Sequence, residues 1–414
     1  MKTTTTVYHV DNREVLKRFA DATFHAIVTD PPYELGFMGK KWDSSGIAYD
    51  RELWQQCLRV LKPGGYVLAF GGSRTYHRLA CAIEDAGFEI RDMIEWLYGS
   101  GFPKSMDVSK AMDKAAGKEN VIGTKPDRWT GKGNSLNFST DREQSVCKIT
   151  APVTADAKLW QGWGTALKPA HEPICIARKP LEGTVAENVL KHGVGAINID
   201  ACRIGTDDTR QKTYKMTSKG LPDGCYNNPG KNTARIDMLA GSACGRFPAN
   251  LILDPIAAAM LDAQSGDQCG AAAPVRKGHS GASKGIYQDF ASKGDDGATF
   301  RGDTGGASRF FYTAKASGTD RGNNVKGALP LFGVEEEEFR NTHPTVKPLA
   351  LMRYLLKLVC PTHLNERIHV LDPFLGSGTT AVACRELGID VTGIELEADH
   401  IAIIRERCPG ATIL

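Results

Sequence analysis

Both ends of this 414-residue chain alternate short apolar strands with amphipathic helices, and this alternation constrains the fold more than any other feature. Near the start, segments 24–30, 66–72 and 88–99 read as strands, and segments 51–63 and 76–87 between them read as helices. Strands that alternate with helices predict a doubly wound, mostly parallel sheet of the α/β class, with helices on both faces.

The C-terminal end repeats the alternation. A helix is expected over 343–359, a strand over 368–374, a helix over 378–388, a strand over 390–396 and a last helix over 397–408. The two ends of the chain are therefore expected to form one sheet.

The middle of the chain differs in composition from both ends. Residues 117–150 and 204–330 are rich in Gly, Ser, Thr, Asn and Lys and contain few apolar runs, which predicts long loops. Segments 160–181, 246–254 and 308–316 are more strand-like. We therefore expect a large, loop-rich insertion that contributes edge elements to the sheet, not a second doubly wound unit.

The net charge of +3 is unevenly distributed. Residues 100–326 carry 31 Lys and Arg against 23 Asp and Glu, whereas residues 1–99 carry 12 against 13 and residues 327–414 carry 8 against 12. The basic middle fits either scattered, solvated charge or a surface that meets a polyanion, and composition alone leaves both readings open.

Several classes of protein are disfavoured. The first residues lack the apolar stretch of a secretory signal, and no run approaches the length of a membrane span. The eleven cysteines form no CxxC pair and the ten histidines no HExxH pattern, so neither a disulfide framework nor a metal site is expected. These features predict a cytoplasmic protein with reduced thiols.

A glycine turn follows the strand at 368–374. The strand ends at Asp372, glycines at Gly376 and Gly378 follow, a helix starts at Thr379, and the next strand ends at Glu395. Glycines let the backbone approach a ligand closely, and an acid in this place typically binds ribose hydroxyls. This order predicts a cofactor that contains a nucleoside. No GK[ST] follows the glycines, which disfavours ATP hydrolysis.

A second motif, TDPPY, ends the strand at 24–30. Two prolines stiffen the backbone between Asp30 and Tyr33. Ligands of a doubly wound sheet gather at the carboxyl ends of its strands, so TDPPY and the glycine turn can face one crevice although more than 300 residues separate them.

These motifs resemble those of the β-class DNA amino-methyltransferases, including prophage-type members, which use S-adenosylmethionine. DPPY at 30–33 precedes the basic middle, and FLGSG at 374–378 follows it, in the order typical of that class. The segments NTHPTVKPLALM at 341–352, VYHVDNREVLKRF at 7–19 and, less specifically, HEPICIARKP at 171–180 extend the resemblance. It implies a Rossmann-like class I methyltransferase fold.

The resemblance implies four catalytic residues: Asp30, Pro31, Pro32 and Tyr33. The Asp30 carboxylate and the carbonyl of Pro31 would accept both N–H groups of an exocyclic amine, directing its lone pair toward the methyl donor. The Pro-Pro pair would fix these acceptors in advance, and Tyr33 would stack on a base that has left the duplex.

It also implies a set of residues around S-adenosylmethionine: Asp11, Thr345, Lys347, Asp372, Phe374, Gly376, Gly378, Thr379 and Glu395. Other readings are open at several of these positions. Asp11 is equally suited to cap a helix, and Lys347 could simply begin one. Phe374 could fill the core, and Glu395 could lie at the surface. Trp160 and Trp163 are candidates for contacting bases.

The resemblance divides the chain into three parts. Residues 1–99 would form the catalytic half of the core and 341–414 the cofactor half, with an insertion over 100–340 whose target-recognition region is mainly 182–330. The implied function is site-specific methylation of adenine N6 in double-stranded DNA, by a bacterial or phage-encoded enzyme. Cytosine N4 is the main alternative, followed by RNA or another amine and by a non-catalytic DNA-binding protein. A homodimer and a partner restriction endonuclease are compatible with the sequence, which identifies neither.

Overall fold

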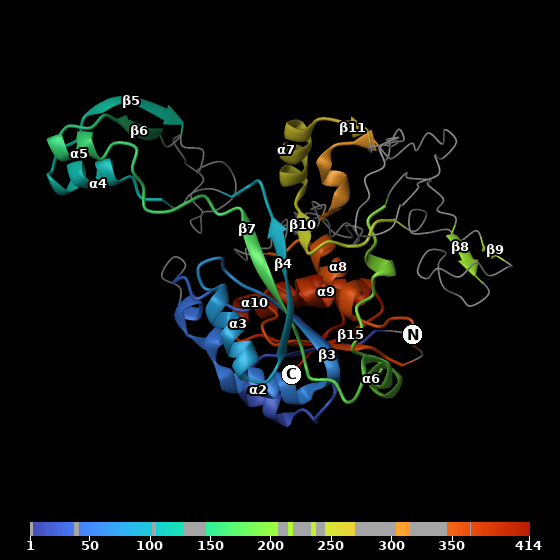
Figure 1. Cartoon of the computed structure of the whole chain (residues 1–414). Coiled ribbons are helices and arrows are strands. Elements are labelled where there is room, and N and C mark those ends of the chain that lie inside the picture. Colours follow the sequence, from blue (N-terminus) through green and yellow to red (C-terminus); the bar gives the residue numbers. More distant parts are fainter. Residues whose placement is uncertain are drawn as a thin grey trace, which may run out of the picture. The chain divides into compact units, whose positions relative to one another are not determined.

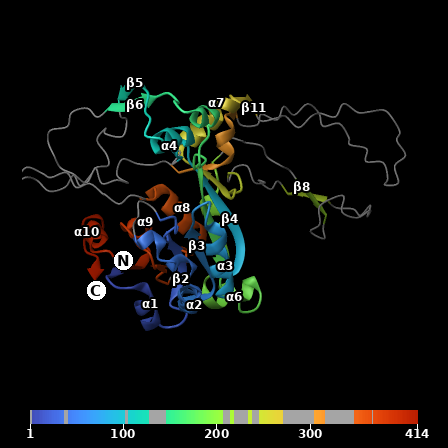
Figure 2. The same ribbon diagram turned by 90° about the vertical axis from the view of Figure 1, so that its left-hand side faces the viewer.

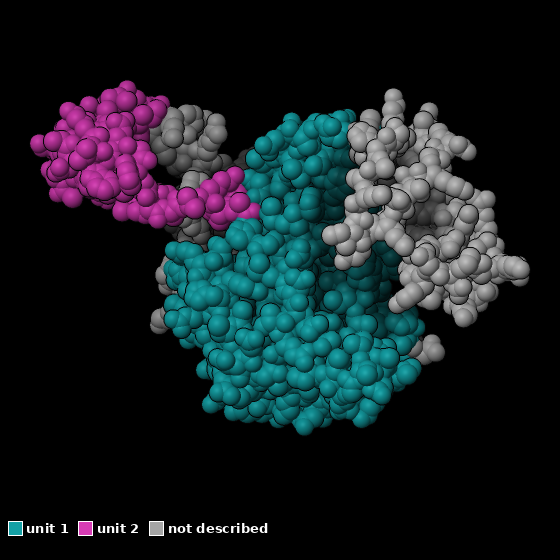
Figure 3. All heavy atoms as spheres, viewed as in Figure 1, with its two compact units in different colours: residues 1–99, 171–414 teal, residues 100–170 magenta. Residues whose placement is uncertain are grey.

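The computed structural model describes residues 3–36, 41–101, 105–126, 146–205, 214–217, 233–236, 245–269, 304–314, 346–364 and 366–414. The chain divides into two compact units, coloured in Figure 3. The first comprises residues 1–99 and 171–414, and the second comprises residues 100–170.

The first unit is built on a ten-stranded sheet with the order β13-β10-β4-β7-β3-β2-β14-β15-β1-β16. The strands are β1 (Thr5–Tyr8), β2 (Phe24–Thr29), β3 (Leu61–Phe70), β4 (Glu89–Leu97), β7 (His171–Arg178), β10 (Leu251–Leu253), β13 (Tyr312–Thr313), β14 (His369–Asp372), β15 (Asp390–Ile394) and β16 (Thr412–Ile413). Neighbouring strands are parallel except where β7 pairs with β3 and β4. The mostly parallel α/β sheet predicted from the sequence is confirmed.

Helices pack on both faces of this sheet (Figures 1 and 2). Those in the first unit are α1 (Asn12–Val15), α2 (Arg51–Val60), α3 (Tyr76–Asp85), α6 (Val185–His192), α7 (Pro255–Ser265), α8 (Leu349–Val359), α9 (Thr379–Glu386) and α10 (Ala398–Arg407). Short 3-10 turns are η1 (Leu16–Arg18), η3 (Lys41–Ser44), η4 (Ile47–Tyr49), η5 (Asp200–Cys202) and η6 (Ala307–Phe310).

The buried side chains form two clusters, one on each face of the sheet. Along β2, Ala26 and Val28 belong to the cluster with α8, α9 and α10, whereas Phe24 and Ile27 belong to the cluster with α2 and α3. Every residue of β2 is buried, as expected for a parallel strand covered on both sides. The core therefore holds the carboxyl end of β2 rigidly.

Two predicted helix boundaries next to prolines are wrong. The helix expected over 343–359 begins at Leu349, after Pro348. The helix expected to end at Pro63 ends at Val60, and β3 begins directly at Leu61. The residue before a proline disfavours the helical conformation, so Lys62 belongs to the extended segment with Pro63. A register shift between Phe24 and Ala26 accommodates this early start of β3.

The second unit joins two short helices to a hairpin. The helices are α4 (Val108–Ala115) and α5 (Ala155–Leu159), and the hairpin pairs β5 (Val121–Pro126) with β6 (Val146–Thr150). The carboxylate of Asp113 accepts hydrogen bonds from the backbone N–H groups of Val153 and Thr154 at 2.9 and 3.0 Å, which joins α4 to the start of α5. The rings of Trp160 and Trp163 are exposed and lie 4.9 Å apart. Their contact with bases stays a prediction.

Two further small sheets pair β8 (Tyr214–Thr217) with β9 (Thr233–Ile236) and β11 (Gln268–Cys269) with β12 (Thr304–Gly305). Most of the recognition region predicted at 182–330 lies outside the described residues. The three-part division of the chain therefore stays a prediction. None of the helices in the described residues is both long and apolar enough to cross a membrane.

Candidate active site

The two sequence motifs meet at one edge of the sheet. Strands β2 and β14 are parallel neighbours, with Ile27 beside Leu371, so the residues that follow each strand emerge together. The hydroxyl of Thr29, the last residue of β2, donates a hydrogen bond of 2.7 Å to Asp372 Oδ1, at the end of β14. The TDPPY segment and the glycine turn are thereby joined across more than 300 residues of sequence.

Asp30 follows β2 directly, and its two carboxylate oxygens differ. Oδ2 lies 2.6 Å from Lys347 Nζ. Oδ1 is buried and has no hydrogen-bond partner in the structure. Burial raises the pKa of Asp30, the positive charge of Lys347 counteracts this effect, and the negative charge of Glu172 adds to it. One oxygen is thus paired and the other is an open acceptor.

Glu172 belongs to the same group of side chains, although its position in the sequence did not identify it as a site residue. Its Oε2 accepts a hydrogen bond of 2.8 Å from the hydroxyl of Tyr33 and lies 3.3 Å from Lys347 Nζ. Because β7 runs antiparallel to β3, its first residues lie beside the last residues of β3, with Ile174 opposite Phe70. The only signal in the sequence was the polar pair His171-Glu172 directly before a buried apolar run.

Lys347 is buried between two carboxylates and two aromatic rings. Its Nζ lies 5.1 Å from the ring centroid of Tyr33 and 5.0 Å from that of Phe70. Burial alone would lower the pKa of Lys347, but the charges of Asp30 and Glu172 outweigh this effect and raise it. Lys347 therefore carries a charge that two acids hold in place. Its predicted contact with the cofactor stays a proposal.

Tyr33 is fixed along its backbone as well as at its hydroxyl. The Thr75 hydroxyl donates a hydrogen bond of 2.8 Å to the carbonyl of Tyr33. Gly72 packs closely against the ring, because an added Cβ would lie 3.3 Å from Tyr33 Cβ and Cδ2. The neighbouring Pro31 is buried and Pro32 is half-buried. The four predicted catalytic residues thus form one rigid element.

The glycine turn wraps around Glu395. Glu395 Oε2 accepts a hydrogen bond of 2.7 Å from Gly376 N, and Oε1 accepts one of 2.8 Å from Glu397 N. His400 Nδ1 lies 3.1 Å from Oε1. Gly378 has a φ of +82° and caps α9. Glu395 is buried, so its reading as a simple surface acid is wrong, and Oε2 retains a lone pair for a further donor.

Asp372 and Phe374 tie the turn to the core. Burial raises the pKa of Asp372 to about 6, against hydrogen bonds from Thr29 and from the backbone N–H of Phe374 that favour its charged form. The ring of Phe374 is partly buried against the cluster that contains α2 and α3. The hydroxyl of Thr379 accepts a hydrogen bond of 3.0 Å from Arg407 Nη1.

Asp11 and Asn12 lie at the other side of the glycine turn. Asp11 caps α1 by accepting from Arg13 N at 2.9 Å, and its Oδ2 pairs with Arg13 Nη2 at 2.6 Å, which confirms the capping alternative. Hydrogen bonds from Arg13 lower the pKa of Asp11. Asn12 is buried; its Nδ2 donates to the carbonyl of Pro373 at 3.0 Å, and its Oδ1 has no partner.

These features fit a nucleoside-containing methyl donor. The turn offers a close backbone approach at Gly376 and Gly378, an acid with a spare lone pair at Glu395, and an open buried acceptor at Asn12. Thr345, which was also predicted to contact the cofactor, lies outside the described residues. No cluster of three potential metal ligands is found in the parts of the chain that the structure describes.

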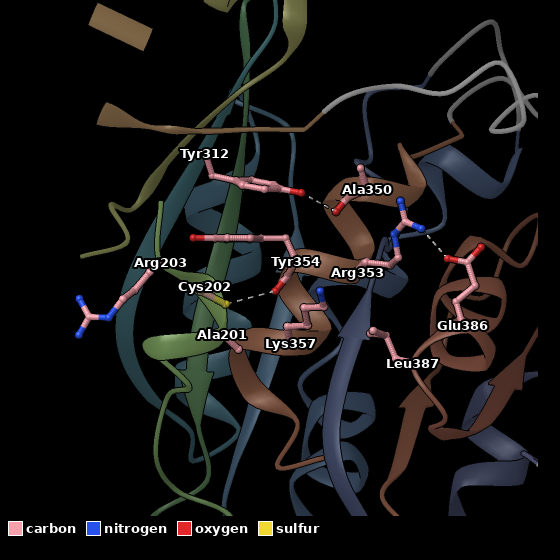
Figure 4. Close-up of a pocket in the computed structure, with 10 residues that line it drawn as sticks. All are labelled: Ala201, Cys202, Arg203, Tyr312, Ala350, Arg353, Tyr354, Lys357, Glu386 and Leu387. Atoms are coloured by element: carbon pink, nitrogen blue, oxygen red, sulfur yellow. Dashed lines mark hydrogen bonds and ion pairs between the residues drawn. The ribbon is translucent and has the colours of Figure 1, made fainter. Parts of the chain in front are cut away.

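A separate cleft of about 390 Å³ lies between α8, α9, η5 and β13 (Figure 4). Its charged groups are largely neutralised, because Arg353 pairs with Glu386 at 2.7 Å and Arg203 with Asp200 at 2.8 Å. None of the predicted site residues lines it. This cleft is therefore not part of the site predicted from the sequence.

The chain is similar to known methyltransferases over part of its length, and a family model matches most of it. Over 151 residues the chain is 30% identical to the Type II methyltransferase M.HindIII of Haemophilus influenzae. The matched segment covers 36% of this chain and 37% of that protein. Over 71 residues it is 39% identical to the Type II methyltransferase M2.DpnII of Streptococcus pneumoniae, covering 17% and 25%. The matched segments thus span well under two thirds of either relative.

Solved structures match over nearly the whole chain at low identity. The structure of M1.HpyAVI is 15% identical with a TM-score of 0.37, covering 98% of both chains. The cytosine-N4-specific PvuII DNA methyltransferase is 11% identical with a TM-score of 0.41, covering 98% of this chain and 87% of that one. The family model described as DNA methylase, of the N6 and N4 amino-methyltransferases, matches residues 24–406 and so includes both strand-end motifs. The chain belongs to this DNA methylase family.

Proposed function

We propose that the chain transfers a methyl group from S-adenosylmethionine to the N6 amine of adenine in double-stranded DNA. Membership of the DNA methylase family supports the type of reaction. The tetrapeptide DPPY supports adenine, because the resemblance associates this form of the motif with adenine more than with cytosine. The observation that carries the proposal is Asp30 Oδ1, which is buried without a partner beside Tyr33.

The geometry around Asp30 suits an amine. Leaving a buried acceptor without a hydrogen bond costs about 1–3 kcal/mol, and a substrate N–H would recover this. Because Lys347 occupies Oδ2, the amine is directed to Oδ1, and the carbonyl of Pro31 would accept its second N–H. An exocyclic amine held in this way directs its lone pair away from the ring system. When bound, S-adenosylmethionine supplies an electrophilic methyl group on a sulfonium.

The cofactor would be held by residues of the glycine turn and by residues that contact this turn. Glu395 Oε2 would accept from a ribose hydroxyl, the backbone of Gly376 and Gly378 would allow close approach, and Asn12 Oδ1 would accept from a further donor. The other predicted contacts stay proposals: Asp11, Thr345, Lys347, Asp372, Phe374 and Thr379.

Duplex DNA is the proposed partner. A homodimer, a partner endonuclease and a cytoplasmic location stay predictions.

Replacing the acceptor tests the proposal. Asp30→Ala should lower methylation of DNA by about 10²–10³-fold, as expected for loss of a group preorganised for the transition state. The dissociation constant for S-adenosylmethionine, measured by calorimetry, should stay near that of the wild type. Asp85→Ala, at an exposed position of α3, is the matched control. Methylation retained in Asp30→Ala would contradict the proposed role of Asp30.

A further inference from the structure

Glu172 contacts two residues of the catalytic element at once. Its Oε2 accepts the hydrogen bond of Tyr33 and faces the ammonium group of Lys347. The side chain of Glu172 is only 20% exposed, and that of Lys347 is 6% exposed. A partly buried carboxylate loses part of its hydration, and these two contacts replace it.

The contact with Tyr33 completes the fixation of the ring. Thr75 and Gly72 hold the backbone and the base of the side chain, but a tyrosine held only there keeps freedom at its outer end. The bond to Glu172 fixes that end. A ring fixed in this way can receive a flipped base without losing further rotational freedom.

The contact with Lys347 places the cation between two acids. Without Glu172, Lys347 would be held by Asp30 alone. Because both carboxylates attract Lys347, its ammonium group is held in one place, where it pairs with Oδ2 of Asp30. This leaves Oδ1 of Asp30 as the open acceptor.

We propose that Glu172 is a positioning residue of this site: it presets the Tyr33 ring and the Lys347–Asp30 pair before the base arrives. The inference rests on the proposed function. Glu172 acts through Tyr33 and Lys347 and needs no contact with the substrate. An antiparallel strand that starts at the catalytic edge supplies it.

Three variants and a control test this role. For each, kcat for methylation of unmethylated genomic DNA is compared with that of the wild type. Glu172→Ala should lower kcat by about 10–100-fold, the loss typical of a hydrogen bond to a charged group, while KM for S-adenosylmethionine stays unchanged. Tyr33→Phe should lower kcat less, by about 10-fold. The double variant should be no slower than Glu172→Ala, because both changes remove the same bond. Glu406→Ala, exposed on α10, is the matched control.

The pH profile separates positioning from a merely structural role. Burial is the main cause of the raised pKa of Asp30, and the negative charge of Glu172 adds to it. Glu172→Gln keeps a neutral acceptor for Tyr33 but removes this added contribution, so the acidic limb of kcat should move to lower pH. A variant that only loosened the fold would lower activity without moving this limb. Wild-type kcat in Glu172→Ala, or an unmoved limb in Glu172→Gln, would overturn the inference. Absence of methylation by the wild type would instead overturn the proposed function.

Discussion

Lys347 is buried between the carboxylates of Asp30 and Glu172, and Lys347→Met removes its charge while keeping most of its volume. The substitution leaves two acids, formerly 2.6 and 3.3 Å from the ammonium group, facing each other. Removing one partner of a buried ion pair costs about 3–5 kcal/mol. Because the side chains of Asp30 and Glu172 keep 22% and 20% exposure, the lower end of this range, about 3 kcal/mol, is expected.

The cost should depend on pH in a defined direction. Burial already raises the pKa of Asp30 in the folded protein, and loss of Lys347 would raise it further. The folded variant then binds a proton more tightly than the unfolded chain, so its stability is greatest at low pH and is lost as the pH rises through the raised pKa. The destabilisation relative to wild type should therefore be largest near about pH 8 and smaller near about pH 5.

Urea unfolding at both pH values, followed by circular dichroism, measures this difference. Lys357→Met is the matched control, since Lys357 lies on α8 and is exposed; it should change the free energy of unfolding by less than about 0.5 kcal/mol. A destabilisation by Lys347→Met that is equal at the two pH values would refute the electrostatic reasoning. A Lys347→Met variant as stable as the wild type at both pH values would refute it as well.

Two further predictions concern the cofactor side. Because the pKa of Asp372 is raised to about 6, its contribution to stability is present below its ordinary pKa of 3.8 and is lost as the pH rises through about 6, by about 3 kcal/mol in total. Asp372→Asn should flatten this part of the stability profile in thermal unfolding; an unchanged slope would contradict the assignment. Gly378→Ala places a Cβ at a φ of +82° and 3.1 Å from Ile404 Cγ1, and should cost about 1–3 kcal/mol and weaken binding of S-adenosylmethionine in calorimetry. The control Gly388→Ala, at a φ of +74° with no neighbour within 4 Å, should cost less and leave binding unchanged; equal effects of both would show that the contact with Ile404 is unimportant.

The alternation of apolar strands and helices was sufficient to predict the sheet. Strands such as β2 and β14 are short apolar runs that end in polar motifs, and parallel neighbours necessarily bring those ends together. The local pattern could not fix boundaries next to prolines. It predicts a helix over Lys62 and Lys347, but Lys62 lies in β3 and Lys347 lies before α8, and each of them precedes a proline.

The part of the site that the sequence did not predict depends on strand direction. An antiparallel strand has the same apolar pattern as a parallel one, so nothing local in residues 171–178 indicates that β7 starts at the catalytic edge. Only its pairing with β3 and β4 brings Glu172 to Tyr33. Lys347 itself was predicted as a site residue, but its pairing with Asp30 and Glu172 was not, because both acids lie more than 170 residues away in sequence.

Nucleoside mass spectrometry would identify the base that the protein methylates. Wild-type protein would be incubated with S-adenosylmethionine and unmethylated genomic DNA, and the DNA would then be digested to nucleosides. We expect N6-methyladenine, formed by the wild type and not by Asp30→Ala. N4-methylcytosine would contradict the assignment of the base while keeping the role of Asp30, and the absence of any modified base would contradict the proposed function itself.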